Sequence, residues 1–332
     1  MKNNYWCEQI IDINRFNTYY LYPSKKINTN NFVNKIVYRI KFIRELKRFA
    51  PDIIHGHITP LIRSAILPII SSKPNYVFFT LHSNPFRVKG MDKCWAKFGF
   101  NKLGIIPVCL NEEQAKMAQQ HYGFKHYEIL HNGVDFEKIR NNIISKEEAR
   151  KLFNIDVNSF VLCACGRLDK VKNYPLMLDI FKKVLEKKTN AVLLIAGEGS
   201  EKEFLINYTK KLGIKENVRF LGNLDNPIPL YCSANVFLLT SHSESMSLVL
   251  MEAQACGCKC VISSGVPKES IITNNVVSMR ENATLEEWTN DILTDNCSFE
   301  KPRFTEADYE VHAMSQKCKE MYLRYLNGEK DE

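Results

Sequence analysis

Short apolar runs that end in polar or glycine-rich loops recur along this chain, and segments with helical periodicity separate them. VFFTLHSN over 77–84, FVLCACG over 160–166 and AVLLIAGEGS over 191–200 are three examples. Strands that alternate with helices in this way form parallel sheets, because a parallel connection needs a long crossover, usually a helix. The pattern therefore predicts an α/β protein whose ligands bind beyond the carboxyl ends of the strands.

At 332 residues the chain is long enough for two domains, each with its own core. We predict two Rossmann-like, doubly wound domains that face each other across a cleft, with a C-terminal helix that packs back on the first domain. Asn111 with Gln114 predicts a capping-box start for one helix of the first domain. The predicted domains span 1–142 and 143–304, and the C-terminal helix falls within 305–332.

The composition, 45% hydrophobic and 25% charged, is typical of a soluble globular protein. The N-terminus lacks the apolar core of a signal peptide, so we expect a cytoplasmic protein. The eleven cysteines of the chain are scattered along the sequence, which favours reduced thiols over a disulfide framework. The run Cys-x-Cys-x-Cys over 256–260 lacks a zinc-ligand spacing, and alternation along a strand explains it better.

The net charge of +8 is unevenly distributed. Residues 1–144 hold 21 Lys and Arg against 10 Asp and Glu, whereas the remainder holds 24 against 27. A basic amphipathic helix predicted over 32–49 is either a contact with an anionic membrane surface or a domain helix with a solvated basic face. Nucleic acid is not an expected partner, because the basic half lacks a ribbon of cations interleaved with aromatic residues.

One stretch, SHSESMSLVLMEAQACGCKCVI over 241–262, predicts a helix that starts at Ser247. The first amides of such a helix, at Leu248 and Val249, have no intrahelical acceptor and would favour a phosphate. The alternative is an ordinary capped helix. Glu244 and Glu252 lie eight residues apart on either side of this start. Because carboxylates accept hydrogen bonds from vicinal hydroxyls, this arrangement suits a nucleotide-sugar.

The motifs together resemble the family-4 retaining glycosyltransferases, also described as glycosyl transferases group 1, which have the GT-B fold. The resemblance covers most of the chain and rests on the order and spacing of short motifs. These are PDIIHGH, TLHS, HNGVD, GRLDKVKN, IAGEGS, FLGNL and ESMSLVLMEAQACG.

The resemblance implies a role for each matching residue. Arg167 and Lys172 would neutralise the donor diphosphate, and Glu252 would bind the ribose hydroxyls. Glu244 would lie by the donor sugar, and His82 would face the reaction centre from the first domain. The other implied donor contacts are Ser247, Leu248, Val249, Gly166, Gly197, Glu198 and Asn223. No cofactor and no metal are expected, and a UDP-sugar is the default donor.

The implied reaction is transfer of a hexose or N-acetylhexosamine with retention, in which the leaving diphosphate takes the acceptor proton. The implied acceptor is a glycan or lipid-linked glycan in capsule, exopolysaccharide or lipopolysaccharide synthesis, at the inner face of the plasma membrane. The family's Glu-Gly-Phe-Pro is Glu-Ser-Met-Ser here, from Glu244. No glycine-rich loop precedes PDIIHGH, so we expect the first domain to lack its usual first strand. The alternative function is a catalytically impaired donor-binding relative that acts as a partner protein. His55 and His57, in PDIIHGH, are interpreted as structural.

Overall fold

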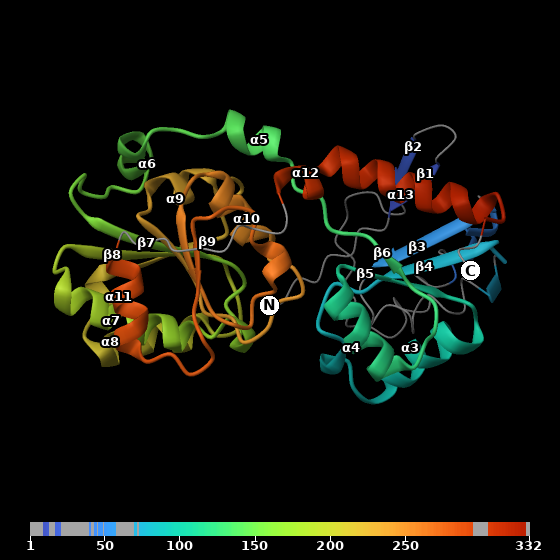
Figure 1. Cartoon of the computed structure of the whole chain (residues 1–332), viewed down its shortest axis with the longest axis horizontal. Coiled ribbons are helices and arrows are strands. Elements are labelled where there is room, and N and C mark those ends of the chain that lie inside the picture. The colour runs from blue at the N-terminus through green and yellow to red at the C-terminus, as the bar shows by residue number, and fades with distance from the viewer. Residues whose placement is uncertain are drawn as a thin grey trace. The chain divides into compact units, whose positions relative to one another are not determined.

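The computed structural model describes residues 9–12, 17–20, 40, 43–44, 46–48, 50–57, 70–71, 73–294 and 305–329. The chain divides into two compact units (Figure 1). The first contains residues 1–129 and 322–332, and the second contains residues 130–321. Each unit is built around its own parallel sheet, as the alternation of strands and helices predicts.

The sheet of the first unit has four parallel strands in the order β3-β4-β5-β6. A separate antiparallel pair, β1 with β2, lies near the start of the chain, where the sequence predicted no strand. The strands are β1 (Gln9–Asp12), β2 (Asn17–Tyr20), β3 (Ile53–His57), β4 (Tyr76–Thr80), β5 (Ile106–Cys109) and β6 (Glu128–Ile129).

Successive side chains of β4 pack on opposite faces of this sheet, because side-chain direction alternates along a strand. Val77 and Phe79 join a core with α3 (Gly90–Lys102) and α4 (Glu112–Tyr122), which lie side by side below the sheet in Figure 1. Phe78 instead contacts Tyr322 and Tyr325 near the C-terminus. A short 3₁₀ helix, η2 (Pro85–Arg87), precedes α3.

The sequence predicted a capping box of Asn111 and Gln114 at the start of α4. Its first hydrogen bond is confirmed, whereas the second is replaced by other bonds of the Gln114 side chain. Asn111 Oδ1 accepts from the Gln114 amide at 2.7 Å. The Gln114 side chain does not complete a capping box with Asn111. Its Oε1 accepts from the Leu110 amide, and its Nε2 donates to the Leu81 carbonyl, so Gln114 ties the ends of β4 and β5 together.

The second unit contains six parallel strands in the order β12-β11-β10-β7-β8-β9. The first of these along the chain, β7, is central, and the order reverses between β7 and β10. This reversal is a topological switch point, where open α/β sheets bind their ligands. The strands are β7 (Phe160–Cys165), β8 (Ala191–Ala196), β9 (Val218–Gly222), β10 (Val236–Leu239), β11 (Lys259–Ile262) and β12 (Val276–Ser278).

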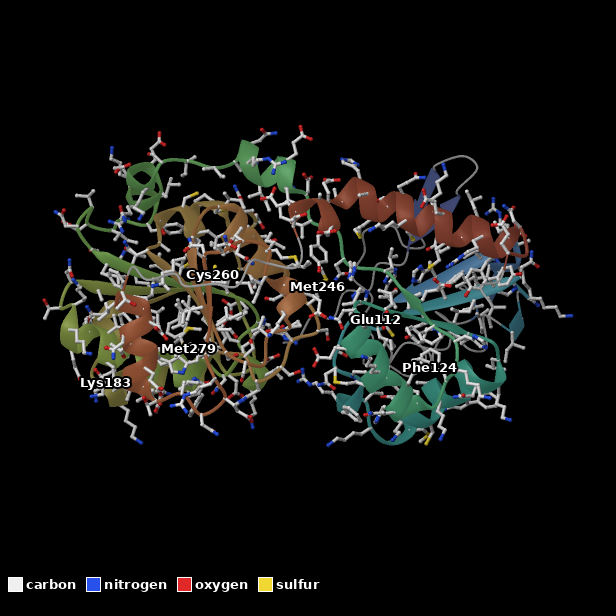
Figure 2. All side chains as sticks on the ribbon, viewed as in Figure 1. Glu112, Phe124, Lys183, Met246, Cys260 and Met279 are labelled. Carbon is white, nitrogen blue, oxygen red and sulfur yellow. The ribbon has the colours of Figure 1, made fainter. Side chains whose placement is uncertain are left out.

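Helices of the second unit bury apolar side chains against this sheet, and α7 and α11 share one core with β7 and β8. Cys260 and Met279 are buried in the unit, whereas Lys183 projects from its surface (Figure 2). The helices are α5 (Phe136–Asn141), α6 (Lys146–Leu152), α7 (Tyr174–Lys187), α8 (Lys202–Leu212), α9 (Ile228–Ser233), α10 (Leu248–Ala255) and α11 (Leu285–Leu293). Short 3₁₀ helices are η3 (Lys170–Lys172), η4 (Lys215–Asn217) and η5 (Lys268–Ser270).

The C-terminal segment is two helices, where the sequence predicted one. α12 (Glu306–Tyr309) and α13 (Val311–Leu326) are separated by Glu310, which is extended and pairs with Val134. Tyr309 is completely buried beside His131, with ring centroids 5.1 Å apart. The division between the units falls within α13, so Tyr322 and the residues after it belong to the first unit.

Two further predictions concerned the Cys-x-Cys-x-Cys run over 256–260 and a basic helix over 32–49. The Cys-x-Cys-x-Cys run does not alternate along one strand, because Cys256 caps the end of α10 and only Cys260 lies within β11. The predicted basic helix over 32–49 falls largely outside the described residues. Across the described ranges, no helix has the length and apolar character needed to span a bilayer.

Candidate functional site

Most of the predicted site residues lie at the carboxyl edge of the six-stranded sheet, around the switch point. Gly166 and Arg167 follow β7 directly, and the Ser241–Ser247 segment follows β10. The chain reaches this edge repeatedly because every strand of the sheet is parallel. Residues that are about 75 positions apart in sequence therefore meet at one place.

Glycine loops form the base of this edge. Gly197 donates to the Gly222 carbonyl at 2.7 Å, and Gly166 donates to the Ala196 carbonyl at 3.0 Å. A Cβ on Gly197 would lie 2.0 Å from the Gly166 oxygen, and one on Gly199 would lie within 2.1 Å of the neighbouring loop backbone. Side chains at these positions would force the loops apart. The glycines thus set the close spacing of the loops after β7, β8 and β9.

The centre of the edge holds an ion pair that is largely withdrawn from water. Lys172 Nζ lies 2.7 Å from Glu244 Oε1, and the two side chains are 16% and 13% exposed. Ser241 Oγ donates to the same Glu244 oxygen at 2.5 Å. The structure thus brings together two residues for which the family resemblance implied separate contacts, diphosphate for Lys172 and sugar for Glu244.

Arg167 is positioned differently from Lys172. Its side chain is 70% exposed, and its Nε donates to Asp169 Oδ2 at 2.7 Å. The other Asp169 oxygen accepts from the amides of Val171 and Lys172, which starts η3. Asp169 therefore orients both predicted cations, and the sequence analysis missed it. An aspartate that accepts from amides two and three residues further on is a recognisable local signal.

At the start of α10, the amides of Ser247, Leu248 and Val249, which the family resemblance implied as donor contacts, are not equivalent. The Ser247 amide donates to Ser270 Oγ at 2.9 Å, which leaves Leu248 and Val249 at positions where helix geometry supplies no acceptor. Ser247 is 2% exposed, and its Oγ has no hydrogen-bond partner among the described residues. A buried hydroxyl without a partner costs free energy, which a bound polar group would recover.

Gln254 holds the loop around Ser270 against α10. Its Nε2 donates to the Ser270 carbonyl at 2.8 Å, and its Oε1 accepts from the amides of Ile272 and Thr273. Gln254 is 3% exposed, so these bonds are shielded from water. Ser270 and Gln254 were not predicted as site residues, because only the tertiary fold brings their loop to the helix start.

Glu252 lies further along α10 and is half-buried. Its Oε2 accepts from the Tyr231 hydroxyl at 2.9 Å. Burial raises the pKa of Glu252 above its ordinary value, while the bond from Tyr231 opposes that rise. Tyr231 thus fixes one carboxylate oxygen and leaves the other available to accept from a ligand hydroxyl. The sequence analysis did not single out Tyr231.

The remaining predicted donor residues lie at the margin of this edge. Glu198 Oε1 pairs with Lys202 Nζ at 2.6 Å, and both side chains are substantially exposed. A Cβ on Gly222 would lie 3.3 Å from Glu198, so this carboxylate lies beside the end of β9. Asn223 follows β9 directly and is exposed.

His82 belongs to the first unit and lies at the carboxyl edge of that unit's sheet. Its Nε2 is 2.9 Å from Nδ1 of His57, and the His57 ring stacks on His55. His55 is hydrogen-bonded to Tyr322 and to Thr80. Burial, with the neighbouring imidazoles, lowers the pKa of His55 to about 3. Desolvation and His57 also lower the pKa of His82, so this cluster is neutral near pH 7.

Within the described ranges, no group of three or more His, Cys, Asp or Glu side chains is arranged to hold a metal ion. The edge of the second unit nevertheless combines three chemical features. It has two cations, a helix start whose amides at Leu248 and Val249 have no intrahelical acceptor, and a fixed carboxylate. Together these features can hold a phosphate-containing ligand that also carries vicinal hydroxyls.

Comparison with known proteins gives several matches. An O-antigen biosynthesis glycosyltransferase of Escherichia coli, WclY, is 31% identical over 238 residues, which span 67% of this chain and 63% of that protein. The Escherichia coli UDP-Gal:α-D-GlcNAc-diphosphoundecaprenol α-1,3-galactosyltransferase is 28% identical over 68% of this chain and 61% of its own length. The chain thus spans less than two thirds of these relatives.

Among solved structures, HepE of Anabaena in complex with UDP and glucose aligns with a TM-score of 0.74 at 15% identity, over 89% of this chain and 84% of HepE. This likeness shows that the fold is shared. Two family models match the sequence, Glycosyltransferase Family 4 over residues 15–138 and Glycosyl transferases group 1 over residues 145–303. The chain therefore belongs to the glycosyltransferases that these two models describe.

Proposed function

We propose that this protein transfers a hexose or N-acetylhexosamine from a UDP-sugar to a glycan or lipid-linked acceptor in polysaccharide synthesis, with retention. The observation that carries the proposal is the convergence of Lys172, Glu244 and the α10 start at the switch point of the second unit. The relatives support it, since one is named for O-antigen biosynthesis and another for a UDP-galactose donor and a diphosphoundecaprenol acceptor.

In this proposal the diphosphate lies at the start of α10. The amides of Leu248 and Val249 would donate to one phosphate, and the orphaned Ser247 hydroxyl would gain a partner there. The Arg167 guanidinium is exposed, and among the described residues it bonds only to Asp169, so it can swing toward the diphosphate at little cost. Together with Lys172 it would offset the charge of the leaving group without a metal ion.

Glu252 would bind the ribose. Its carboxylate is fixed on one side by Tyr231, and two vicinal hydroxyls can donate to the oxygen that remains. The buried position strengthens such bonds because water competes less for the carboxylate. Glu244 would lie by the donor sugar, where it also keeps Lys172 oriented.

The proposed reaction needs no protein nucleophile. The acceptor oxygen forms a bond to the anomeric carbon on the face from which the diphosphate leaves. The bond from that carbon to the diphosphate oxygen breaks, and this oxygen takes the acceptor proton. Catalysis is then positioning together with stabilisation of the charge on the leaving diphosphate. The participation of His82 stays a prediction, as does a location on the cytoplasmic face of the membrane.

The proposal can be tested by incubating the protein with a panel of nucleotide-sugars and following thermal unfolding. A ligand at a hundredfold excess over its dissociation constant stabilises the folded state by about 2.7 kcal/mol. The UDP-sugar that stabilises most is then given with lipid-linked acceptors, and the anomeric configuration of the product is read by NMR. The same assay with EDTA tests independence from metal.

We expect an α-linked product from an α-linked donor, formed equally well with EDTA. Inversion at the anomeric carbon would contradict the retaining mechanism. Stabilisation by UDP-sugars without transfer to any acceptor would favour the alternative, a donor-binding partner protein. The absence of stabilisation by any nucleotide-sugar would contradict the donor site itself.

A further inference from the structure

Helices α9 and α10 of the second unit are in contact (Figure 1), and they carry two cysteines that meet between them. Cys232 lies in α9, and Cys256 caps the end of α10. The two side chains are hydrogen-bonded to each other, and both are half-buried rather than sealed in the core. Two thiols that touch each other and that a small molecule can reach are the arrangement from which a disulfide forms.

A second pair of side chains joins the same two helices beside the cysteines. Tyr231 precedes Cys232 in α9, and its hydroxyl donates to Glu252 Oε2 at 2.9 Å. Glu252 lies one turn before Cys256, whose amide donates to the Glu252 carbonyl at 3.1 Å. Consecutive residues of α9 therefore contact residues that are one turn apart on α10. A change in the cysteine pair would be transmitted directly to the carboxylate.

The hydrogen bond between the two thiols makes them chemically unequal. It lowers the pKa of Cys232 to about 6, although burial opposes this shift, and the backbone amide of Ile144 lowers the pKa further. The same bond raises the pKa of Cys256, and burial adds to that rise. Cys258 and Glu252 also lie near Cys256 and favour its neutral form. Near pH 7 Cys232 is therefore a thiolate, which is the nucleophilic form of cysteine, and Cys256 donates to it.

Another cysteine pair of the second unit has the opposite character. Cys163 is hydrogen-bonded to Cys258, but Cys163 is completely buried in β7, and burial raises its pKa well above the ordinary value. Burial also raises the pKa of Cys165 at the end of the same strand. Buried thiols of this kind are inert. The pair of Cys232 and Cys256 differs from them in both access and charge.

We propose that Cys232 and Cys256 form a reversible redox site, at which a low-molecular-weight disulfide oxidises the pair to an intramolecular disulfide and thereby weakens donor binding. The Cys232 thiolate attacks one sulfur of the oxidant, forms a mixed disulfide with it and releases a thiolate. This thiolate takes the proton of Cys256, whose sulfur then attacks Cys232 and expels the second thiolate. The two cysteines lose two electrons and one proton, and the oxidant becomes one thiol and one thiolate.

Closure of the disulfide would change the geometry around Glu252. An S–S bond is shorter than a contact between non-bonded sulfurs, so it draws α9 and the end of α10 together. Tyr231 and Glu252 belong to the same two helices, and their hydrogen bond would shift with them. The carboxylate would then leave the position from which it binds a ribose. This consequence rests on the proposed function, whereas formation of the disulfide requires no nucleotide.

The test uses the full chain, first reduced and then freed of reductant. The protein is incubated with glutathione disulfide, the remaining thiols are blocked with N-ethylmaleimide, and disulfides are mapped by mass spectrometry of unreduced peptides. The variants are C232S and C256S, and the control is C94S, which removes an exposed cysteine of α3. Thermal unfolding checks that each variant is folded, and C232A and C256A replace a serine variant that is not. Calorimetric titration measures UDP affinity before and after oxidation.

We expect a disulfide between Cys232 and Cys256 in the wild type and in C94S. C256S should stop at a mixed disulfide of Cys232 with glutathione, because no second thiol displaces it, and C232S should form neither product. In C256S the rate of this reaction measures how much of Cys232 is thiolate when Cys256 does not donate a proton. In the wild type the rate should change by less than about twofold between roughly pH 6.5 and 7.5, whereas an ordinary thiol gains nearly tenfold.

The expected effect on the donor site is a loss of affinity. Oxidation of the wild type should weaken UDP binding by at least about tenfold, which corresponds to the loss of one hydrogen bond to a charged group. Dithiothreitol should restore the affinity. C232S should bind UDP equally well with and without the oxidant, because it lacks the thiolate that reacts first.

Three results would overturn the inference. One is the absence of a disulfide between Cys232 and Cys256 after oxidation, and another is a mixed disulfide that forms on Cys94 as fast as on Cys232. The third is unchanged UDP affinity in a protein whose disulfide between Cys232 and Cys256 has been mapped. Failure of UDP to bind the reduced wild type would contradict the proposed function, and the disulfide map would still decide whether the redox site exists.

Discussion

At the carboxyl edge of the six-stranded sheet, the polar groups include charged side chains and a buried serine hydroxyl. Lys172 pairs with Glu244, while Ser247 Oγ has no partner in the described part of the chain. At the carboxyl edge of the four-stranded sheet, the polar groups are neutral imidazoles bonded to one another and to a tyrosine. The edge of the six-stranded sheet therefore keeps hydrogen-bonding groups that a ligand can use. The imidazoles at the edge of the four-stranded sheet use much of their hydrogen-bonding capacity on one another and on the tyrosine.

The loops at the two sheet edges explain why their polar groups differ. The loops after β7 and β8 approach within backbone contact because glycines lie between them, so the α10 start and the cations can converge on a small volume. The histidine edge is instead closed by Tyr322 from the end of the chain, whose hydroxyl bonds to His55. We therefore expect the two edges to respond differently to substitution and to pH.

The largest expected effect comes from removing one member of the buried ion pair. Lys172→Met leaves Glu244 uncompensated at a position with 13% side-chain exposure, so we expect a loss of about 3 kcal/mol in unfolding free energy. Donor binding should be lost as well. Urea unfolding and calorimetric titration with UDP measure the two effects.

The double variant K172M/E244Q is the informative control for that loss. It should recover most of the stability, since no buried charge remains, but not the donor binding. Lys183→Met breaks an exposed pair with Glu186 and should leave the unfolding free energy nearly unchanged. Equal losses in Lys172→Met and Lys183→Met would show that burial does not distinguish these pairs.

A smaller loss is expected where the loops after β7 and β8 touch. Gly199→Ala places a Cβ 2.1 Å from the Leu168 oxygen, so the loops must separate at a cost of about 2–3 kcal/mol. Affinity for UDP should fall with it. Gly213→Ala meets no atom within 4 Å, and its positive φ alone should cost about 1 kcal/mol without changing UDP affinity. Equal UDP affinities in Gly199→Ala and Gly213→Ala would show that the contact between these loops does not shape the proposed donor site.

The stability of the first unit should depend on pH through His55, His57 and His82, in a direction that follows from their lowered pKa values. His55 has its pKa lowered from 6.5 to about 3, so between these values the unfolded state binds more protons than the folded state. Stability of the first unit is therefore full above pH 6.5 and falls as the pH is lowered through it. His55 alone should account for about 2 kcal/mol by roughly pH 5.

Hydrogen exchange resolved by peptide can measure this effect on β3 and β4 separately from the second unit. His55→Gln should flatten the dependence, while substitution of the exposed His312 should leave it unchanged. His57 and His82 shift in the same direction and add to the slope. A first unit equally protected at about pH 5 and 8 would contradict the lowered pKa values of these histidines.

The smallest effect on stability is expected at Arg167. Its side chain is 70% exposed, so Arg167→Ala should change the unfolding free energy by less than about 0.5 kcal/mol. If it offsets leaving-group charge, turnover should nevertheless fall by a factor of about 10². Arg280→Ala breaks a similarly exposed pair and should leave turnover unchanged. A folded Arg167→Ala enzyme with the wild-type rate would show that this cation has no role in transfer.

The sequence predicted the elements of the second unit well, because their signals are local. FVLCAC and AVLLIA are apolar runs that end in glycine, and both form strands of the parallel sheet. The C-terminal helix was predicted less well, since its interruption at Glu310 arises from pairing with Val134, about 175 residues away in sequence. The β1–β2 pair was also missed.

The predictions for the site also depended on whether the signal is local in the sequence. Arg167, Lys172, Glu244 and Glu252 lie in recognisable motifs, and the structure brings all four to one edge of the second unit. Asp169, which orients Arg167 and Lys172, was missed although its signal is local. Ser270 and Tyr231 were missed because their partners are distant in sequence. Ser270 reaches the Ser247 amide over 23 residues, and Tyr231 reaches Glu252 over 21.

The sequence by itself therefore determined the family, the alternating architecture and the chemical types present at the strand ends. Local periodicity and glycine spacing encode these features, and they need no knowledge of long-range contacts. Only the tertiary structure decided which charges pair, which amides are already occupied and which hydroxyl is left without a partner. Those outcomes depend on distances between loops, which are fixed by the packing of the whole sheet.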